Sequence, residues 1–89
     1  MNIKDLIDAA SANSGKAQKD FAQELGIQPT RLSEWKSGKC KPDANEIAFF
    51  AEKAGLPVIQ TVAELEAELH PRYASLWKRA VRELRENQG

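Results

Sequence analysis

The chain has 89 residues, the size of one small domain, and its 42% of apolar residues makes a compact but thin core feasible. No apolar run is long enough to cross a membrane. The single cysteine, Cys40, excludes an internal disulfide, and the single histidine, His70, adds too few ligands for a structural zinc site. We therefore expect no metal and no cofactor. The first residues lack the long apolar run of a signal peptide, which predicts a cytoplasmic protein.

The formal net charge is zero, but the charges are unevenly distributed along the chain. Acidic residues dominate from 43 to 70, and basic residues dominate after His70. Because a phosphate-binding surface is local, a basic block can bind nucleic acid even in a chain without net charge. Such a block lies between residues 16 and 41, and its basic residues are Lys16, Lys19, Arg31, Lys36, Lys39 and Lys41.

Apolar residues recur at helical spacing along the chain, so the predicted fold class is all-α. The first helix is expected to end near residues 13–15 and the second at Gly26. The third helix runs from Pro29 to Ser37–Gly38, because proline suits the first position of a helix. The buried faces of these helices are expected to hold Ile3, Leu6, Ile7, Ala10, Phe21, Ala22, Leu25, Leu32 and Trp35.

Two capping signals predict the starts of a fourth and a fifth helix. Asp43 and Glu46 have the spacing of a capping box, and so do Thr61 and Glu64. The fourth helix ends at Gly55–Pro57, and Pro71 breaks the fifth. The residues expected to face inward or to form the apolar side of these two helices are Ile47, Phe50, Ala51, Ala54, Val62, Leu65 and Leu69. A sixth segment, 72–87, carries an apolar stripe of Tyr73, Trp77, Ala80 and Leu84, widened by Leu76 and Val81.

One segment, residues 18–38, carries functional information. In a helix-turn-helix, a small residue such as Ala22 lets two helices cross closely, and Gly26 permits a tight turn at positive φ. Apolar residues after the turn would hold the next helix in place. The side chains left facing outward on that helix are polar, which suits insertion into a DNA major groove. They are Thr30, Arg31, Glu34 and, nearer the edge, Ser33.

The segment resembles the helix-turn-helix of the Cro and phage-repressor family, which has the lambda-repressor-like fold. The resemblance covers residues 1–57 and implies a DNA-binding domain there, followed by a C-terminal helical extension over 58–89. A charged helical tail after a short repressor domain is similar to small phage-borne regulators. The matching positions are Gln18, Ala22, Gly26, Ile27, Leu32, Ser33, Trp35 and Gly38.

The resemblance also implies the residues that contact double-stranded DNA. Gln18 would contact a phosphate, the outward face of the third helix would read bases, and the lysines in and after that helix would contact the backbone. Arg31 is the best candidate for guanine because its donors form a two-pronged fork. The implied DNA-binding residues are Gln18, Gln28, Thr30, Arg31, Ser33, Glu34, Lys36, Lys39 and Lys41.

Two residues depart from the pattern of the family. Pro29 stands where family members often place a polar base-reading side chain, and it can offer only an apolar contact. Glu34 stands where a neutral or basic residue is common. Its carboxylate can accept a hydrogen bond from cytosine N4 but repels phosphates, so it would sharpen specificity and lower nonspecific affinity.

Simpler interpretations stay open beside these. The segment could be an ordinary helical hairpin, with Arg31 a solvated residue and Glu34 its ion-pair partner. The apolar stripe of 72–87 could cover the core of its own domain. Against this last interpretation, we favour a homodimer formed through the region from Thr61 onward, which would set two recognition helices about one DNA turn apart on a palindromic operator.

Three classes of function compete. We favour a dimeric, phage-type transcriptional repressor that acts without catalysis. The alternative is the antitoxin of a toxin–antitoxin pair, in which the C-terminal helices hold a protein partner and the acidic residues of 64–68 face it. An enzyme is the weakest of the three, because the sequence has no evident nucleophile with a base, no phosphate-binding glycine loop and no paired metal ligands.

Overall fold

The computed structural model describes residues 1–88, with side chains as far as Glu86. Within this range the chain is all-α and has no strand, which confirms the predicted fold class. None of the helices within residues 1–88 is long and apolar enough to span a lipid bilayer. The elements in chain order are α1 (Ile3–Ser14), α2 (Gln18–Leu25), α3 (Pro29–Ser37), α4 (Ala44–Ala54), α5 (Val58–Leu69), the 3-10 turn η1 (Pro71–Tyr73) and α6 (Ala74–Gln88).

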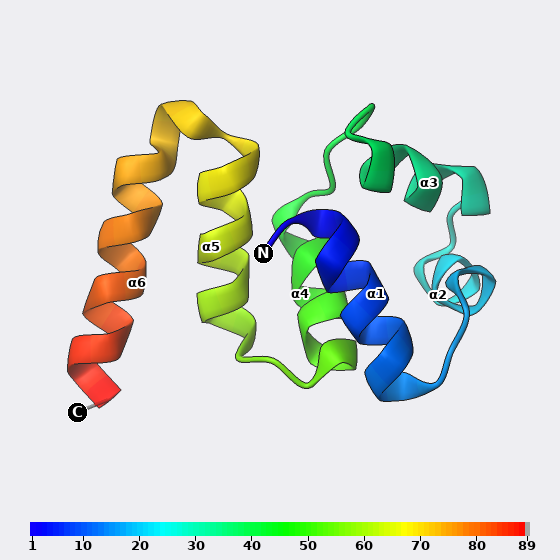
Figure 1. Ribbon diagram of the computed structural model, residues 1–89, viewed down its shortest axis with the longest axis horizontal. Coiled ribbons are helices and arrows are strands. Elements are labelled where there is room, and N and C mark those ends of the chain that lie inside the picture. The colour runs from blue at the N-terminus through cyan, green and yellow to red at the C-terminus, as the bar shows by residue number, and fades with distance from the viewer. Residues whose placement is uncertain (89) are drawn as a thin grey trace.

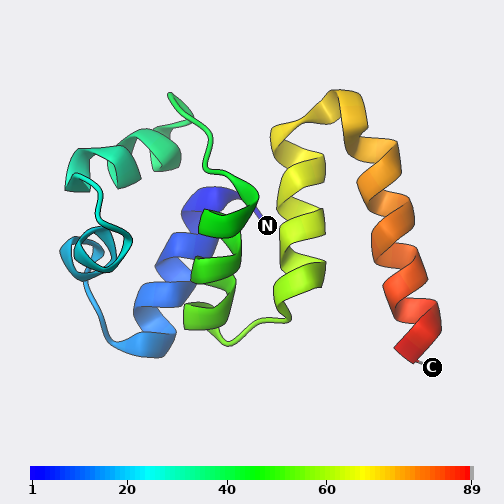
Figure 2. The same cartoon turned by 180° about the vertical axis from the view of Figure 1, so that it is seen from behind.

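The helices lie in three neighbouring groups (Figure 1). Helices α1 and α4 are side by side in the centre, α2 and α3 lie at one end, and the antiparallel pair α5 and α6 lies at the other. The view from behind shows the same order (Figure 2). The molecule measures 37 × 27 × 18 Å, and its long dimension runs between these two ends. Helices α3 and α6 are therefore far apart in the fold.

One hydrophobic core joins the first five helices. Each of them contributes a fully buried side chain, in chain order Leu6, Phe21, Trp35, Phe50 and Leu65. The ring of Phe50 lies edge-on to Phe21 and Trp35, with centroid distances of 5.5 and 6.1 Å. Edge-on contacts suit the charge distribution of aromatic rings and add to the free energy of burial. The α3 helix is therefore fixed on α4 by the largest side chain of the core.

The ends of α1 to α4 fall where the sequence predicts them. The carboxylate of Asp43 accepts the backbone N–H of Glu46, and the carboxylate of Glu46 accepts that of Asp43, both at 2.8 Å. This confirms the capping box at the start of α4. The residues expected to face inward on these helices are buried or half-buried.

The predicted start of the fifth helix is wrong. Helix α5 begins at Val58 directly after Pro57, and the N–H of Thr61 donates to the Pro57 carbonyl at 3.0 Å, inside the helix. Thr61 is 4% exposed, because its side chain belongs to the interior and not to a cap. The carboxylate of Glu64 accepts a hydrogen bond from Gln60 Nε2 at 3.1 Å instead. Because α5 has already begun at Val58, Thr61 lies inside the helix and cannot cap its start.

Helix α6 and the turn η1 before it lie against α5, and only part of their apolar stripe is buried. Val81 is 9% exposed and Trp77 is half-buried, whereas Tyr73 and Leu76 are 53% and 63% exposed. One edge of the stripe thus completes the contact with α5, as the core-covering interpretation expects. The other edge faces solvent, and the homodimer stays a prediction that depends on it.

Candidate nucleic-acid interface

The connection between α2 and α3 is short and fixed by backbone hydrogen bonds. At its start Gly26 has φ +70°, a value that side chains with a Cβ rarely adopt. The N–H of Gly26 donates to the Gln23 carbonyl at 3.2 Å, and the N–H of Ile27 donates to the Ala22 carbonyl at 3.0 Å. This pair of bonds closes the end of α2. The first residue of α3, Pro29, then follows with its φ already suited to a helix.

Helix α3 has one buried face and one exposed face. Leu32 and Trp35 are buried in the core, and they anchor the helix from below. On the other side, Thr30, Arg31 and Ser33 are exposed, as is Gln28 just before the helix. The helix therefore presents a polar outer surface whose position is set by apolar contacts beneath it.

Four of the implied DNA-binding residues surround a single shallow hollow of about 360 Å³. Gln28, Thr30, Arg31 and Glu34 line it, together with Gly26 and Ile27 of the turn. Ser33, although exposed, is not part of its wall. The hollow brings together donors, acceptors and one cation at the N-terminal half of α3, the part of a recognition helix that meets base edges first.

The carboxylate of Glu34 is engaged by the loop that follows α3. It accepts a hydrogen bond from the thiol of Cys40, with 3.2 Å between Sγ and Oε2. This bond and the negative charge of Glu34 raise the pKa of the Cys40 thiol above its usual value, since both oppose loss of the proton. The ion pair between Glu34 and Arg31 that the simpler interpretation offers is not among the contacts formed by the side chains of residues 1–86.

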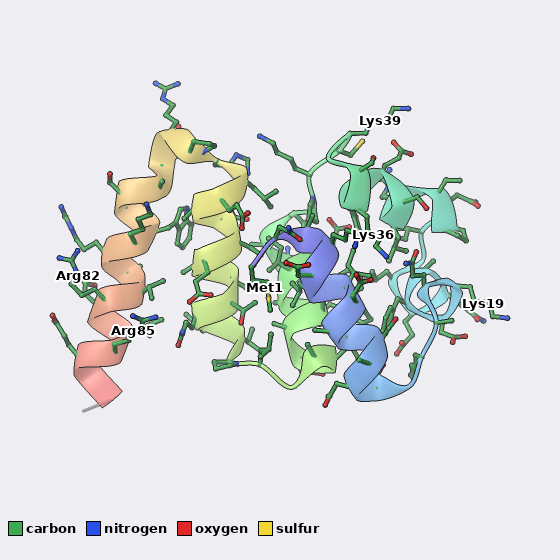
Figure 3. The ribbon with its side chains drawn as sticks, in the orientation of Figure 1. Met1, Lys19, Lys36, Lys39, Arg82 and Arg85 are labelled. Atoms are coloured by element: carbon green, nitrogen blue, oxygen red, sulfur yellow. The ribbon has the colours of Figure 1, made fainter. Side chains whose placement is uncertain are left out.

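Two lysines of the basic block are directed toward the body of the protein. Lys36 Nζ lies 2.9 Å from Asp8 Oδ1 of α1, and Figure 3 shows this side chain pointing inward from α3. Lys16 Nζ lies 3.3 Å from Glu24 Oε2. A phosphate contact by Lys36 would require its ion pair with Asp8 to break. The structure therefore does not place Lys36 on the outward surface that the family resemblance implies.

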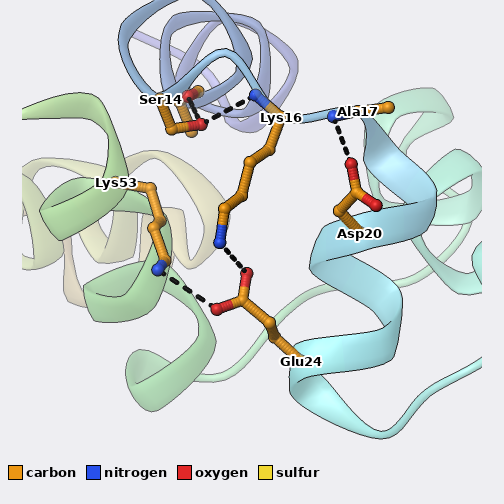
Figure 4. Close-up of polar contacts among 7 residues, drawn as sticks. Ser14, Lys16, Ala17, Asp20, Glu24 and Lys53 are labelled. Carbon is orange, nitrogen blue, oxygen red and sulfur yellow. Dashed lines mark hydrogen bonds and ion pairs between the residues drawn. The ribbon is translucent and has the colours of Figure 1, made fainter.

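The pair formed by Lys16 belongs to a small network that holds α2 in place (Figure 4). The carboxylate of Glu24 also accepts from Lys53 of α4 at 3.2 Å, so it joins α2 to the centre of the fold. The two lysines hold the pKa of Glu24 below its usual value, mainly through the hydrogen bond from Lys53. At the start of α2, the carboxylate of Asp20 accepts the N–H of Ala17 at 3.0 Å.

The remaining cations of the basic block are free for a ligand. They form no ion pair with any side chain of residues 1–86, and all of them are exposed: Lys19, Arg31, Lys39 and Lys41. Lys19 and Lys39 project away from the body of the molecule (Figure 3). Lys19 is absent from the set of DNA-binding residues implied by the family resemblance, although it directly follows Gln18 in the sequence and belongs to the basic block. Gln18 itself is half-buried at the first position of α2.

No known protein family, no curated protein and no solved structure matches this chain. The geometry of α2, α3 and the loop after them therefore carries the functional argument.

Proposed function

We propose that the chain is a sequence-specific DNA-binding protein with a lambda-repressor-like helix-turn-helix formed by α2 and α3. The observation that carries the proposal is the outer surface of α3, where exposed polar side chains surround a hollow, while Leu32 and Trp35 on the opposite side of the helix are buried in the core. A helix seated in this way can enter the major groove, which admits one α-helix.

In the proposed complex, the two kinds of contact come from different parts of the interface. Arg31 donates two hydrogen bonds to guanine, and Thr30, Gln28 and Ser33 contact neighbouring base edges or phosphates. The free cations, Lys19, Lys39 and Lys41, neutralise backbone phosphates, and Gln18 adds a contact at the start of α2. Glu34 can accept a hydrogen bond from a cytosine N4 through its second carboxylate oxygen, while Oε2 keeps the thiol of Cys40.

We further propose that the protein acts in the cytoplasm as a dimeric repressor, of the type found in phages, by occupying an operator. The exposed edge of the apolar stripe, with Tyr73 of η1 and Leu76 of α6, supplies an apolar surface for a second copy. A two-fold dimer places its two recognition helices on half-sites of a palindrome. Blocking a promoter in this way requires no catalysis by the protein.

Selection from a pool of random duplex DNA tests this function. We expect an enriched palindromic sequence, and we expect its affinity to fall steeply with salt, with a log–log slope of about −0.9 for each phosphate neutralised. A control protein carrying both Thr30→Ala and Arg31→Ala should still bind duplex DNA but enrich no sequence. Absence of binding even at low salt would disprove the proposed function.

A further inference from the structure

A second surface with free cations lies between α5 and α6. The two helices enclose a groove of about 350 Å³, called the α5–α6 groove below. Its floor is formed by small or apolar side chains, Ala63 and Ala67 of α5 and Val81 of α6. Of the charged residues that line it, Glu64 comes from α5, and Lys78, Arg82 and Arg85 come from α6. The groove is therefore apolar at its base and positively charged along one side.

The three cations form a row along one side of α6. They are four and three residues apart, so they follow one another at about one helical turn and span about 10 Å. All three side chains are exposed, and none forms an ion pair with a side chain of residues 1–86. By contrast, four lysines in the first four helices and their connections form ion pairs with Asp8 or Glu24. They are Lys4, Lys16, Lys36 and Lys53.

We infer that the α5–α6 groove binds an acidic amphipathic helix of a partner protein. Carboxylates at one-turn spacing on such a helix match the row of Lys78, Arg82 and Arg85, and its apolar side chains fill the floor at Ala63 and Ala67. A nucleic acid would use the cations but would leave the apolar floor without a partner. The side of the groove with Glu64 would also repel a continuous phosphate backbone, whereas a peptide can present a neutral side chain there.

This site is separate from the proposed DNA-binding surface. Helix α6 and helix α3 lie at opposite ends of the long dimension of the molecule (Figure 1). A partner in the α5–α6 groove therefore does not occupy the surface of α3, and both ligands can be bound at once. The charge of the inferred partner also differs from the sequence-based expectation, in which the acidic residues of 64–68 face a basic partner. The groove has one acidic and three basic side chains, so it favours an acidic partner.

The test is a binding measurement with a synthetic peptide on the full chain. The probe is a fluorescein-labelled helical peptide of about 15 residues, with a leucine stripe beside glutamates at one-turn spacing. A second peptide has glutamine in place of each glutamate. We expect saturable binding of the acidic peptide, at least about tenfold weaker binding of the glutamine peptide, and weakening of the former by salt.

Matched variants locate the site. Arg82→Glu should weaken the acidic peptide by at least about tenfold, whereas Arg79→Glu, which makes the same charge change outside the groove, should weaken it less than about threefold. Ala67→Leu, which fills the floor, should also weaken it. Methyl NMR signals of Ala63 and Ala67 should shift on titration, and circular dichroism should show unchanged helix content in each variant.

Several results would overturn the inference. Equal losses in Arg82→Glu and Arg79→Glu would mean that only net charge attracts the peptide. If the acidic peptide does not bind, the inference is wrong. Loss of duplex DNA binding in Arg82→Glu would then assign the groove to nucleic acid, and loss of the dimer mass would assign it to a second copy. The inference is independent of the DNA-binding proposal, because peptide binding and DNA selection are measured separately and either can fail alone.

Discussion

Lys36 and Asp8 form an ion pair of 2.9 Å that joins α3 to α1 across 28 positions of sequence. The carboxylate of Asp8 also lies 3.5 Å from Lys4 on its own helix. The hydrogen bond from Lys36 is the main reason that the pKa of Asp8 is lower than usual. The edge of α3 is thus fixed by charge, while Leu32 and Trp35 fix its underside by burial.

Replacing Asp8 by Asn should lower the stability of the protein at neutral pH. Because half of the Asp8 side chain is exposed and screened by water, the expected loss is only about 0.5 kcal/mol. A carboxyl group whose folded-state pKa is depressed stabilises the fold above its unfolded pKa, and this contribution is lost as the pH falls through the folded-state pKa. The difference between wild type and Asp8→Asn should therefore shrink below about pH 4.

Urea denaturation at neutral and acidic pH measures this difference. Glu52→Gln is the matched control, since Glu52 is exposed and forms no ion pair with a side chain of residues 1–86. A loss in Asp8→Asn that stays constant down to pH 3, or one no larger than the control, would mean that the pair contributes nothing.

Local signals in the sequence account for most of the helix boundaries. Asp43 and Glu46 are three residues apart, and Gly26 is next to the helix that it ends, so their hydrogen bonds are decided by neighbours in the chain. The wrong prediction of a helix start at Thr61 also comes from a local pattern. The spacing of Thr61 and Glu64 fits a capping box, but the burial of Thr61 depends on where α5 lies in the fold, and the local pattern does not contain that information.

The parts of the candidate site that sequence could not predict are contacts between distant segments. Nothing in the pattern around Lys36 points to Asp8, and nothing around Glu34 points to the thiol of Cys40. Both contacts depend on the tertiary path of the chain. The exposed polar residues of α3, by contrast, follow from helical periodicity once Leu32 and Trp35 are assigned to the core.

The contact between Glu34 and Cys40 predicts slow alkylation of the thiol. Since the pKa of Cys40 is raised, the fraction of reactive thiolate near pH 8 should be smaller than for an ordinary cysteine. Glu34→Gln should lower this pKa and increase the rate of reaction with iodoacetamide. Rates measured across a pH series give the pKa directly, and Glu52→Gln again serves as the control. Identical profiles for Glu34→Gln and wild type would exclude the hydrogen bond as the cause.

If a second copy binds the exposed apolar edge of α6, the dimer should depend on Leu76. Leu76→Asp places a charge in an apolar contact and should convert the dimer to a monomer, whereas Ser75→Asp, at an exposed neighbouring position, should not. Sedimentation analysis gives the mass of each variant. Truncation after Gln60 is a poorer test, because it removes Leu65 from the core. A Leu76→Asp protein that stays dimeric, or a wild type that is monomeric at high concentration, would place no second copy on this edge.

Arg31 and Lys39 should have different effects on DNA binding, although both are exposed cations near α3. Arg31→Ala removes a two-pronged donor to a base, so it should cost about 1–3 kcal/mol on the selected sequence and relax preference at one base pair in each half-site. Lys39→Ala removes a phosphate contact, so it should weaken all sequences by a similar factor and reduce the salt slope by about one for each protomer that binds.

Competition of each variant for the selected duplex and for a scrambled duplex, at two salt concentrations, separates these effects. The ratio of the two affinities measures base reading, and the salt slope measures phosphate contact. If Arg31→Ala lowers both affinities equally, Arg31 is a phosphate contact and the bases are read by Thr30 or its neighbours. If Lys39→Ala alters the ratio, Lys39 takes part in base reading, and its assignment as a phosphate contact is wrong.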